Sequence, residues 1–579
     1  MKHLLQGTKY MWQLPAVDQS IVTAIASQYN LSFPIAQTLV SRGFIESEQI
    51  DSFLFSSQER DVADPALMKD AQKAVERMLY AIEHKQKILV FGDYDVDGIT
   101  SSAMMMLSLI PLGAQINFFL PNRVKDGYGL STSIVQRAAE NGYSLIITVD
   151  NGITAFDPVK AANALGVDVI ITDHHRSHGD VPDAYAIVNP NQHDCPYPFK
   201  ALAGVGVTFK ILSFLYAKKG LTLPVKVYEL LLLGTIADVV PLLGENRFWV
   251  RYGLNFVNHN ESLSLKVLKQ NGKVTKDVLS ATDIGFSLTP QINALGRLED
   301  PRQGVKFLIG SDLAETQEVG RILFELNERR KEIEQSIIAE IVHEVEKGSI
   351  DPSKENIIIA ASKQWPAGVI GLVASRIVAR YGKPTILLHL GKDGIAKGSC
   401  RSISEFNMFD ALAASKNLLI QFGGHSVAAG LALKVENIAP LKQFLEQRIN
   451  EQLTPFDLQQ KLKLDACAHL SDLTKKFITD MHHLEPFGNQ NSIPTFYFKN
   501  VTLVQKPTLL KDAHVKCSVF ADGVIKPVIF FNRPELFTQL YDYGNKPFDI
   551  AAQVTENHWN GKANIELMGT DIAFHQEGV

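Results

Sequence analysis

The sequence has few cysteines, no long apolar run and no excess of charge of either sign. Its 579 residues include four cysteines, Cys195, Cys400, Cys467 and Cys517, and no two of them form a C-x-x-C pair. This spacing argues against a disulfide framework and against a cysteine-based zinc site. The longest apolar stretch, Leu230 to Leu243, is interrupted by Asp238, so we do not expect a membrane span.

An export signal is also missing from the first residues. The opening MKHLLQGTKYMWQLP contains no apolar core followed by a small-residue cleavage site, so we expect a cytoplasmic protein. Lys and Arg number 57 against 62 Asp and Glu, a net charge of −5. That balance argues mildly against a protein whose whole surface attracts nucleic acid, but it leaves room for a local basic patch.

The length corresponds to about three to five domains, and the patterns along the chain suggest where they lie. We predict a helical segment over residues 1–70, an α/β domain over 71–310, a connecting helix over 311–350, a second α/β domain over 351–454 and a small β-barrel over 455–579. The connecting helix is predicted because apolar residues recur every three to four positions between Leu313 and Lys347.

Short apolar runs in the first α/β domain each end in acidic residues. KILVFGDYD, SLIITVD and VDVIITD are rich in Val, Ile and Leu without polar alternation, which is typical of buried parallel strands. In open sheets of this kind ligands bind beyond the carboxyl ends of the strands. The acids are therefore expected at a binding site.

The first acidic run is Asp93, Asp95 and Asp97, directly after a strand and before Gly98. Alternate carboxylates here could converge on a hard divalent cation. A calcium loop begins in the same way, but the glutamate that it requires is missing, because position 12 from Asp93 is Met104. A solvated acidic turn is the other alternative.

Three further motifs strengthen the metal interpretation. Asp150 follows the next strand, Asp173-His174-His175 follows the one after, and Asp238 stands among apolar residues. An unpaired carboxylate in an apolar setting is costly, whereas a cation would neutralise it. Carboxylates with imidazole and no thiolate suit Mn²⁺ or Mg²⁺, and a two-metal site could polarise a phosphodiester.

This combination resembles the DHH phosphoesterase superfamily, and within it the RecJ family of bacterial single-stranded-DNA exonucleases, over almost the whole chain from about residue 40. The resemblance implies a DHH domain with a parallel sheet, a DHHA1 domain and a carboxyl-terminal OB-fold. It also implies a set of catalytic metal ligands, Asp95, Asp97, Asp150, His174 and Asp238, with Asp150 as the bridge. His175 and Asp173 are implied as a ligand or as partners that orient the imidazole. Phe91 departs from many DHH enzymes, which carry a histidine there, and Asp93 is a candidate replacement ligand.

Motifs in the second α/β domain resemble DHHA1 and suit a phosphate chain. Between Lys354 and Arg401 there are eight Lys and Arg against two acids, which is the local basic patch. The resemblance implies that Arg297, Ser399 and Arg401 hold a 5′ phosphate, and Arg376 and His425 lie in neighbouring glycine-rich motifs. The alternative is that the glycines of these motifs serve only to let helices pack closely.

Two further segments are candidates for contacts to unpaired bases. Arg123 and Tyr128, in PNRVKDGYG, could stack on bases of any sequence, although an ordinary glycine-rich loop is the alternative. In the barrel, four lysines and three phenylalanines could form one basic, aromatic face: Lys499, Lys506, Lys511, Lys516, Phe496, Phe498 and Phe520. A purely structural barrel is the alternative.

The leading hypothesis is a metal-dependent exonuclease that degrades single-stranded DNA from its 5′ end to mononucleotides, in DNA recombination and repair. One rival is a DHH phosphodiesterase acting on short oligonucleotides or cyclic dinucleotides, or a pyrophosphatase. The other is a catalytically silent DNA-binding scaffold. The resemblance further suggests a single-strand-binding protein and a RecQ-type helicase as partners, and we expect a monomer.

Overall fold

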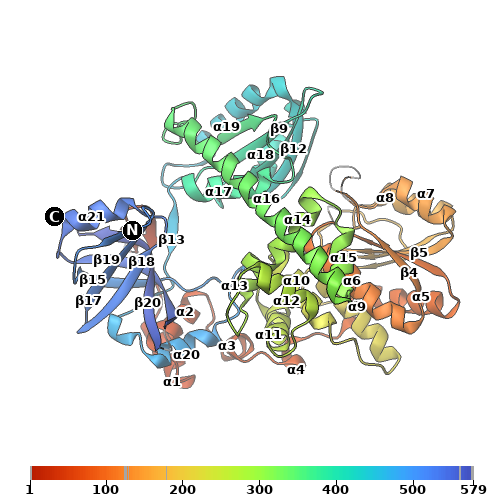
Figure 1. Cartoon of the computed structure of the whole chain (residues 1–579), viewed down its shortest axis with the longest axis horizontal. Coiled ribbons are helices and arrows are strands. Elements are labelled where there is room, and N and C mark those ends of the chain that lie inside the picture. Colours follow the sequence, from red (N-terminus) through yellow and green to blue (C-terminus); the bar gives the residue numbers. More distant parts are fainter. Residues whose placement is uncertain (1–2, 123–126, 128, 178, 560–561, 576–579) are drawn as a thin grey trace. The chain divides into compact units, whose positions relative to one another are not determined.

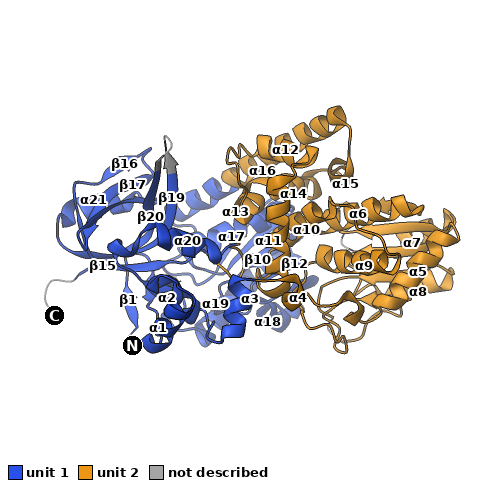
Figure 2. Cartoon of the chain, turned by 90° about the horizontal axis from the view of Figure 1, so that it is seen from below, with its two compact units in different colours: residues 1–55, 337–485, 493–579 blue, residues 56–336, 486–492 orange. Residues whose placement is uncertain are grey.

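The computed structural model describes residues 3–122, 127, 129–177, 179–559 and 562–575. By internal contacts the chain divides into two compact units (Figure 2). Unit 2 contains residues Ser56–Ser336 and the short segment Pro486–Ser492, and unit 1 contains Met1–Phe55, Ile337–Glu485 and Ile493–Val579. Each unit is described by itself.

A five-stranded parallel sheet forms the centre of unit 2. Its strands are β3 (Lys87–Gly92), β4 (Gln115–Phe119), β5 (Tyr143–Val149), β6 (Asp168–Thr172) and β7 (Ala186–Val188), in the order β4-β3-β5-β6-β7. Gly92 pairs with Val149, and Val149 pairs with Thr172. The carboxyl ends of the three neighbouring strands are therefore level, and the predicted buried parallel strands are confirmed.

Helices α5 (Ala71–Glu83), α6 (Val96–Leu109), α7 (Thr132–Glu140), α8 (Phe156–Ala164) and α9 (Gly204–Lys218) pack on this sheet (Figure 1). The other helices of unit 2 are α4 (Gln58–Asp61), α10 (Val227–Ala237), α11 (Gly244–His259), α12 (Leu263–Asn271), α13 (Ala281–Asp283), α14 (Thr289–Leu298) and α15 (Arg302–Ile309), with the 3-10 turns η1 (Pro65–Leu67) and η2 (Ile110–Leu112) and the π-helical turn η3 (Ile284–Leu288).

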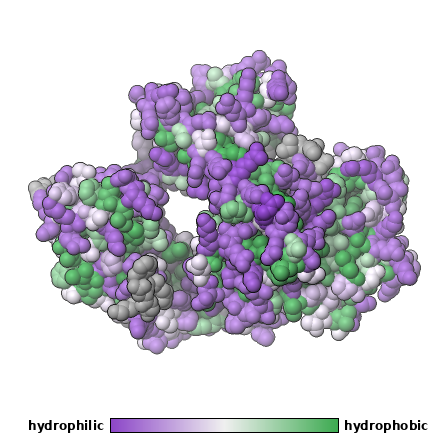
Figure 3. All heavy atoms as spheres, in the orientation of Figure 1, coloured by the Kyte–Doolittle hydropathy of each residue, from purple (hydrophilic) through white to green (hydrophobic). Residues whose placement is uncertain are grey.

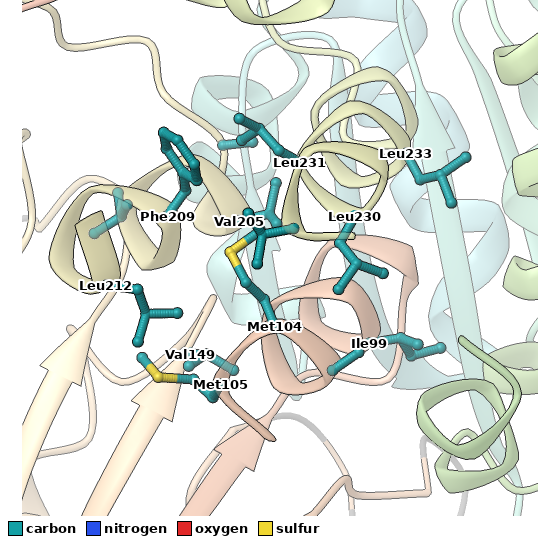
Figure 4. Packing of buried hydrophobic residues seen from close by; sticks show 14 of the residues in the cluster. Ile99, Met104, Met105, Val149, Val205, Phe209, Leu212, Leu230, Leu231 and Leu233 are labelled. Carbon is teal, nitrogen blue, oxygen red and sulfur yellow. The ribbon is translucent and has the colours of Figure 1, made fainter. Parts of the chain in front are cut away.

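The largest core of unit 2 lies around α6. Side chains of α6, α9 and α10 point into one shared apolar cluster, with Met104 near Val205 and Leu230 (Figure 4). All three are fully buried, and burying such a side chain contributes about 1.5–3 kcal/mol. This packing supports α6 and α9 along their lengths, so their amino-terminal ends are held rigidly at the edge of the sheet.

The predicted connecting helix is α16 (Leu313–Glu346), whose 34 residues span about 50 Å. Residues up to Ser336 belong to unit 2 and later ones to unit 1. Leu323, Ile337 and Ile341 are buried, while hydrophilic side chains cover the exposed face in Figure 3. In the described part of the chain, no helix is both long enough and apolar enough to cross a membrane.

The amino-terminal segment needs one correction, because the prediction gave only helices for residues 1–70. Strands β1 (Leu4–Gln6) and β2 (Met11–Gln13) form an antiparallel hairpin, and β13 (Lys461–Lys463) pairs with β2. Fully buried Asp571 anchors this hairpin by accepting hydrogen bonds from the Tyr10 backbone N–H (3.0 Å) and Trp12 Nε1 (2.9 Å). Helices follow at α1 (Gln19–Gln28), α2 (Phe33–Ser41) and α3 (Ser47–Leu54).

A second α/β module follows in unit 1. Its sheet has the order β11-β12-β10-β9-β8, and only β8 and β9 run parallel. The strands are β8 (Ile358–Ser362), β9 (Thr385–Leu390), β10 (Ile395–Arg401), β11 (Gln421–Gly424) and β12 (Ala428–Lys434), and the helices are α17 (Ile370–Tyr381), α18 (Met408–Ala414), η4 (Lys416–Leu418), η5 (Val435–Asn437) and α19 (Ile438–Gln452).

The carboxyl-terminal region is the predicted barrel. Strands β15 (Phe496–Leu503), β19 (Phe548–Trp559), β20 (Lys562–Phe574), β18 (Val524–Phe530) and β17 (His514–Ala521) pair in that order, and β15 pairs with β17 to close the circle. β14 (Ala466–Cys467), β16 (Thr508–Leu510), η6 (Leu470–Asp472), α20 (Lys475–His483) and α21 (Glu535–Tyr543) complete it.

The hypothesis of one basic, aromatic face on this barrel is wrong for two of its members. Phe496 is 0% exposed and Phe498 is 1% exposed, so both rings lie in the barrel core. They are two residues apart on β15, and alternate residues of a strand point to the same side. Phe520 on β17 is 45% exposed and is the phenylalanine of the three that is accessible.

Candidate metal centre

The turn after β3 places the first three aspartates. Asp95 caps α6, because its Oδ1 accepts hydrogen bonds from the backbone N–H groups of Asp97 (3.0 Å) and Gly98 (3.1 Å). A Cβ added to Gly98 would lie 2.5 Å from the backbone N and O of Asp93, so only glycine fits this position. Asp93 and Asp97 are both buried.

The amino terminus of α9 fixes the Asp97 carboxylate. The Gly204 N–H donates to Asp97 Oδ2 (2.6 Å) and the Val205 N–H donates to Oδ1 (2.7 Å). A Cβ on Gly204 would lie 2.6 Å from Asp150 Cβ, so glycine also makes room for Asp150. These two donors were not predicted from the sequence, although the glycine-containing start Gly204-Val205-Gly206 is a signal for them.

Asp150 follows β5 in a left-handed conformation, with φ +61°. That region is unfavourable for a residue other than glycine and occurs often at functional sites. The Asp150 N–H donates to the Thr172 carbonyl (3.0 Å), which ties this turn to β6. Neighbouring Asn151, fully buried, donates to the carbonyls of Val149 (2.9 Å) and Phe91 (3.3 Å). The turn is thus held from both adjacent strands.

Asp173 orients the two histidines rather than facing the other acids. Its Oδ1 accepts from His175 Nδ1 (2.7 Å) and from the backbone N–H groups of His174 (2.7 Å) and His175 (3.0 Å), and its Oδ2 accepts from the Ile153 N–H (2.9 Å). Asn189 and Asn191 donate to the carbonyls of His175 (2.8 Å) and His174 (2.6 Å). Neither asparagine was predicted from the sequence.

These hydrogen bonds set the charge of the pair. Burial alone would raise the pKa of Asp173, but the His175 side chain and neighbouring amides lower it below its usual value. Burial opposes protonation of His175, yet the hydrogen bond to Asp173 raises the His175 pKa to about 9. His175 is therefore a cation at neutral pH in the metal-free protein.

The ligand atoms gather in three overlapping groups, within each of which they lie no more than 4.8 Å apart. The groups are Asp93, Asp95 and Asp150; Asp97, His174 and Asp238; and Asp150, His174 and His175. Asp150 and His174 each belong to two groups. All six metal-ligand candidates from the sequence are thus brought together, with His175 beside them.

The electrostatics of this cluster suit a cation. Burial, followed by the neighbouring carboxylates, raises the pKa of Asp97 to about 7 and that of Asp150 well above its usual value, and burial raises that of Asp238 to about 8. Burial lowers the pKa of His174, whose Nε2 lies 3.2 Å from Asp150 Oδ1 and 3.6 Å from Asp238 Oδ2.

Two buried atoms test the fit of a metal directly. His174 Nε2 and Asp238 Oδ2 have no hydrogen-bond partner among the described residues. A buried polar atom without a partner is costly, and oxygen and imidazole nitrogen ligands suit Mn²⁺ or Mg²⁺. The residues present therefore fit a divalent cation. Phe91, at the position where many DHH enzymes carry histidine, is fully buried and stacks on Phe119, so it offers no ligand.

Arg297 lies elsewhere in unit 2, on α14. It lines a cavity of about 430 Å³ together with Arg137 and Arg302 and the acids Glu299 and Asp300. Asp300 is paired with Arg302 (2.6 Å). Arg123 and Tyr128, the candidates for base stacking, lie outside the described residues.

Ser399 and Arg401 lie side by side on β10 of unit 1. Arg401 donates to Ser399 Oγ (3.1 Å) and to Ser375 Oγ on α17 (3.1 Å). A Cβ on Gly371 would come within 2.8 Å of Ser399 Oγ, so this glycine lets α17 begin close to the pair. The side chains of Arg376 and His425 are exposed.

Comparisons with known proteins agree with this architecture. Residues 87–235 match the model of the DHH family, N-terminal domain; residues 354–451 match the DHHA1 domain; and residues 464–571 match the RecJ OB domain. The expected fold class is confirmed.

Curated relatives extend over most of the chain. The single-stranded-DNA-specific exonuclease RecJ of Bacillus subtilis is 37% identical over 98% of this chain and 71% of its own length. The protein of the same name from Escherichia coli is 34% identical over 87% of this chain and 90% of its own length.

Solved structures of RecJ from Thermus thermophilus are similar in fold. The structure in complex with Mn²⁺ has a TM-score of 0.82 and 26% identity, covering 98% of this chain and 80% of that one. The structure in complex with Mg²⁺ has a TM-score of 0.75 and 25% identity, covering 98% and 78%. By these identities and coverages, the chain belongs to the RecJ family.

Proposed function

We propose that this protein is a metal-dependent exonuclease that hydrolyses single-stranded DNA from its 5′ end and releases 5′-mononucleotides, in DNA recombination and repair. The main support is the partly buried cluster of five aspartates and two histidines, which gathers beside the level carboxyl ends of the parallel strands. Relatives named single-stranded-DNA-specific exonuclease cover most of the chain, which supports the substrate. The closed barrel supports a polymer substrate, since OB-folds often bind single strands.

The cluster would hold Mn²⁺ or Mg²⁺, the ions bound in the Thermus structures. The proposed ligands are Asp93, Asp95, Asp97, Asp150, His174 and Asp238. Bound there, the cations supply Lewis-acid polarisation of the scissile phosphate and lower the pKa of water.

The protein's own residues do the rest. Asp173 holds the His175 ring through Nδ1 and so fixes its orientation beside the cluster. The amides of Gly204 and Val205 keep Asp97 ionised and aimed once a cation is present.

Basic residues outside the cluster would hold the strand. We propose that Arg297 contacts phosphate of the strand. We propose separately that the Ser399 and Arg401 pair binds phosphate at the 5′ end and so sets polarity. The bond from Arg401 to Ser399 preorganises two donors, and preorganised donors bind anions at a lower entropic cost. Arg376, His425, Arg123 and Tyr128 are proposed as further contacts to DNA.

The test uses one oligonucleotide labelled at either end. Wild-type protein in Mn²⁺ should release labelled mononucleotides early from a 5′-labelled strand and only late from a 3′-labelled strand. Asp150→Ala should abolish both. Equal early release from both ends would overturn the polarity, unchanged activity of Asp150→Ala would overturn the metal centre, and preference for dinucleotides over long strands would overturn the polymer substrate.

The cellular setting is a further part of the proposal. Four free cysteines fit a reducing cytoplasm. We also propose a monomer and, by family resemblance alone, a single-strand-binding protein and a RecQ-type helicase as partners.

A further inference from the structure

The residue after Asp238 has an unfavourable backbone conformation. Val239 has φ +59°, in the left-handed region, and a β-branched residue there is a genuine outlier. Its side chain is 63% exposed, so packing of the side chain does not explain the conformation. Such conformations persist only where the surroundings hold the backbone in place.

A distant segment of the chain holds this backbone. Residues Pro486–Ser492 follow α20 in sequence and precede β15, yet their contacts place them in unit 2. The segment is a self-closed turn: the Gly488 N–H donates to the Asn491 carbonyl (2.8 Å), and Asn491 Nδ2 donates to the Pro486 carbonyl (2.8 Å). Asn491 is 1% exposed. We call this segment the 486–492 turn.

The 486–492 turn contacts the loop after Asp238 at two points through one residue. Asn489 Nδ2 donates to the Val239 carbonyl (2.6 Å), and the Asn489 carbonyl accepts from the Leu242 N–H (2.9 Å). Gly488 lies so close that an added Cβ would be 2.6 Å from Leu242 Cδ1. Hydrogen bonds from Asn489 and packing of Gly488 therefore hold the backbone at both ends of residues 239 to 242.

The orientation of the Asp238 carboxylate depends on this loop. It ends α10 as the C-cap, and its carboxylate lies 3.6 Å from His174 Nε2. If Val239 relaxed to a negative φ, the peptide that joins it to Asp238 would have to rotate. The carboxylate would then move relative to His174, because the Asp238 side chain follows the rotation of its own backbone.

We propose that Asn489 is a positioning residue for the metal centre: the 486–492 turn holds Val239 in its left-handed conformation and thereby aims Asp238. This inference rests on the proposed function, since it takes Asp238 as a metal ligand. It adds a role for a residue 251 positions later in the sequence, which is not among the proposed metal ligands or the proposed DNA contacts.

The experiment is a Mn²⁺ titration of full-length, metal-free protein by calorimetry, with melting temperatures of the same samples. Asn489→Ala, and Asn489→Asp as an isosteric change that removes the donor, should weaken Mn²⁺ binding about 10-fold, the lower end of the effect of outer ligand partners. The matched control is Asn271→Ala, which removes a comparable side-chain bond to the Gly320 carbonyl (2.8 Å) elsewhere in unit 2.

A rescue variant separates positioning from general stability. Asparagine adopts positive φ more readily than valine, so Val239→Asn in the Asn489→Ala background should restore most of the lost affinity. Restoration of Mn²⁺ affinity by a change of backbone preference at residue 239, with the Asn489 contact still absent, is the signature of positioning.

The outcomes are distinguishable. If wild-type protein binds Mn²⁺ and Asn489→Ala binds it equally well, the inference is overturned and the proposed function stands. If Asn271→Ala loses as much affinity as Asn489→Ala, or if Val239→Asn restores nothing, the positioning role is also overturned. If wild-type protein binds no Mn²⁺, the proposed function itself fails.

Discussion

Gly204→Ala should damage the metal centre through the backbone alone. The added Cβ would lie 2.6 Å from Asp150 Cβ and 2.9 Å from Asp150 Cα, whereas carbon atoms pack best at about 3.5–4.0 Å. Either α9 or the Asp150 turn must therefore move by about 1 Å. Asp150 is already in an unfavourable conformation, so neither can move cheaply.

The cost follows from that displacement. Overpacking a buried site typically costs about 1–3 kcal/mol, and a shift of the helix start also weakens the two bonds to Asp97. We expect about 3 kcal/mol of lost stability in urea unfolding of the metal-free protein. A misplacement of about 1 Å near the reacting atoms costs about 100-fold in rate, so nuclease activity should fall by about that factor.

Gly206→Ala is the matched control, two residues further along α9. Its Cβ would lie 3.3 Å from Leu202 Cδ2, the end of a flexible side chain, and alanine favours helix over glycine by about 1 kcal/mol. Stability and activity should therefore stay near wild type. Gly204→Ala protein with wild-type activity and wild-type Mn²⁺ affinity would refute the claim that α9 positions these two aspartates.

Three further predictions concern proton release at the metal centre, the reactivity of two buried thiols and the contact of Arg401 with phosphate. Because Asp97 and Asp238 have raised pKa values of about 7 and 8 in the metal-free protein, Mn²⁺ binding should release more protons at about pH 6.5 than at about pH 8.5; calorimetry in two buffers of different ionisation enthalpy measures this, and equal release at both pH values would contradict it. Burial raises the pKa of Cys400 and Cys517 to about 12, so iodoacetamide at about pH 8 should modify them only in denaturant; mass spectrometry showing rapid modification in the folded protein would be the contrary result. Arg401→Ala should reduce the preference for a 5′-phosphorylated over a 5′-hydroxyl strand about 10-fold or more, since one charge-assisted bond contributes about 1.5–3 kcal/mol; competition between the two strands gives the ratio, and an unchanged ratio would exclude Arg401 from the phosphate contact.

Residues at strand ends were predictable from the sequence for a physical reason. The apolar runs before Asp93, Asp150 and Asp173 indicated buried parallel strands, and parallel strands in register bring their carboxyl ends to one edge. The observed pairing of Gly92 with Val149 and of Val149 with Thr172 is that arrangement. The local sequence pattern was enough to predict that these acids lie together, because each acid follows its strand directly.

Contacts made by backbone atoms were not predictable in the same way. The Gly204 and Val205 amides reach Asp97 from 107 and 108 residues away, and any residue other than proline carries an amide N–H. Asn489 contacts Val239 from 250 residues away. The local sequence of a turn between a helix and a barrel strand does not predict which distant loop the turn contacts. The sequence signals such contacts only where a glycine is needed to let two backbone segments approach closely.

The barrel shows the limit of composition as a guide. Phe496 and Phe498 are aromatic and near lysines in sequence, which favoured a shared binding face, yet both are buried. Period-two alternation puts both on the same side of β15, and that side faces the barrel core. The hairpin at residues 4–13 was missed because its partners, Asp571 and β13, lie at the other end of the chain.

An anomalous-difference map from Mn²⁺-soaked crystals of the protein with a short 5′-phosphorylated oligonucleotide would locate the metal and the strand together. Mn²⁺ should be bonded to Asp150 and His174 at about 2.0–2.3 Å, with a backbone phosphate of the strand against it. Mn²⁺ bound only at other residues, or a strand lying away from Asp150, would contradict the assignment of this cluster as the metal centre of a nuclease.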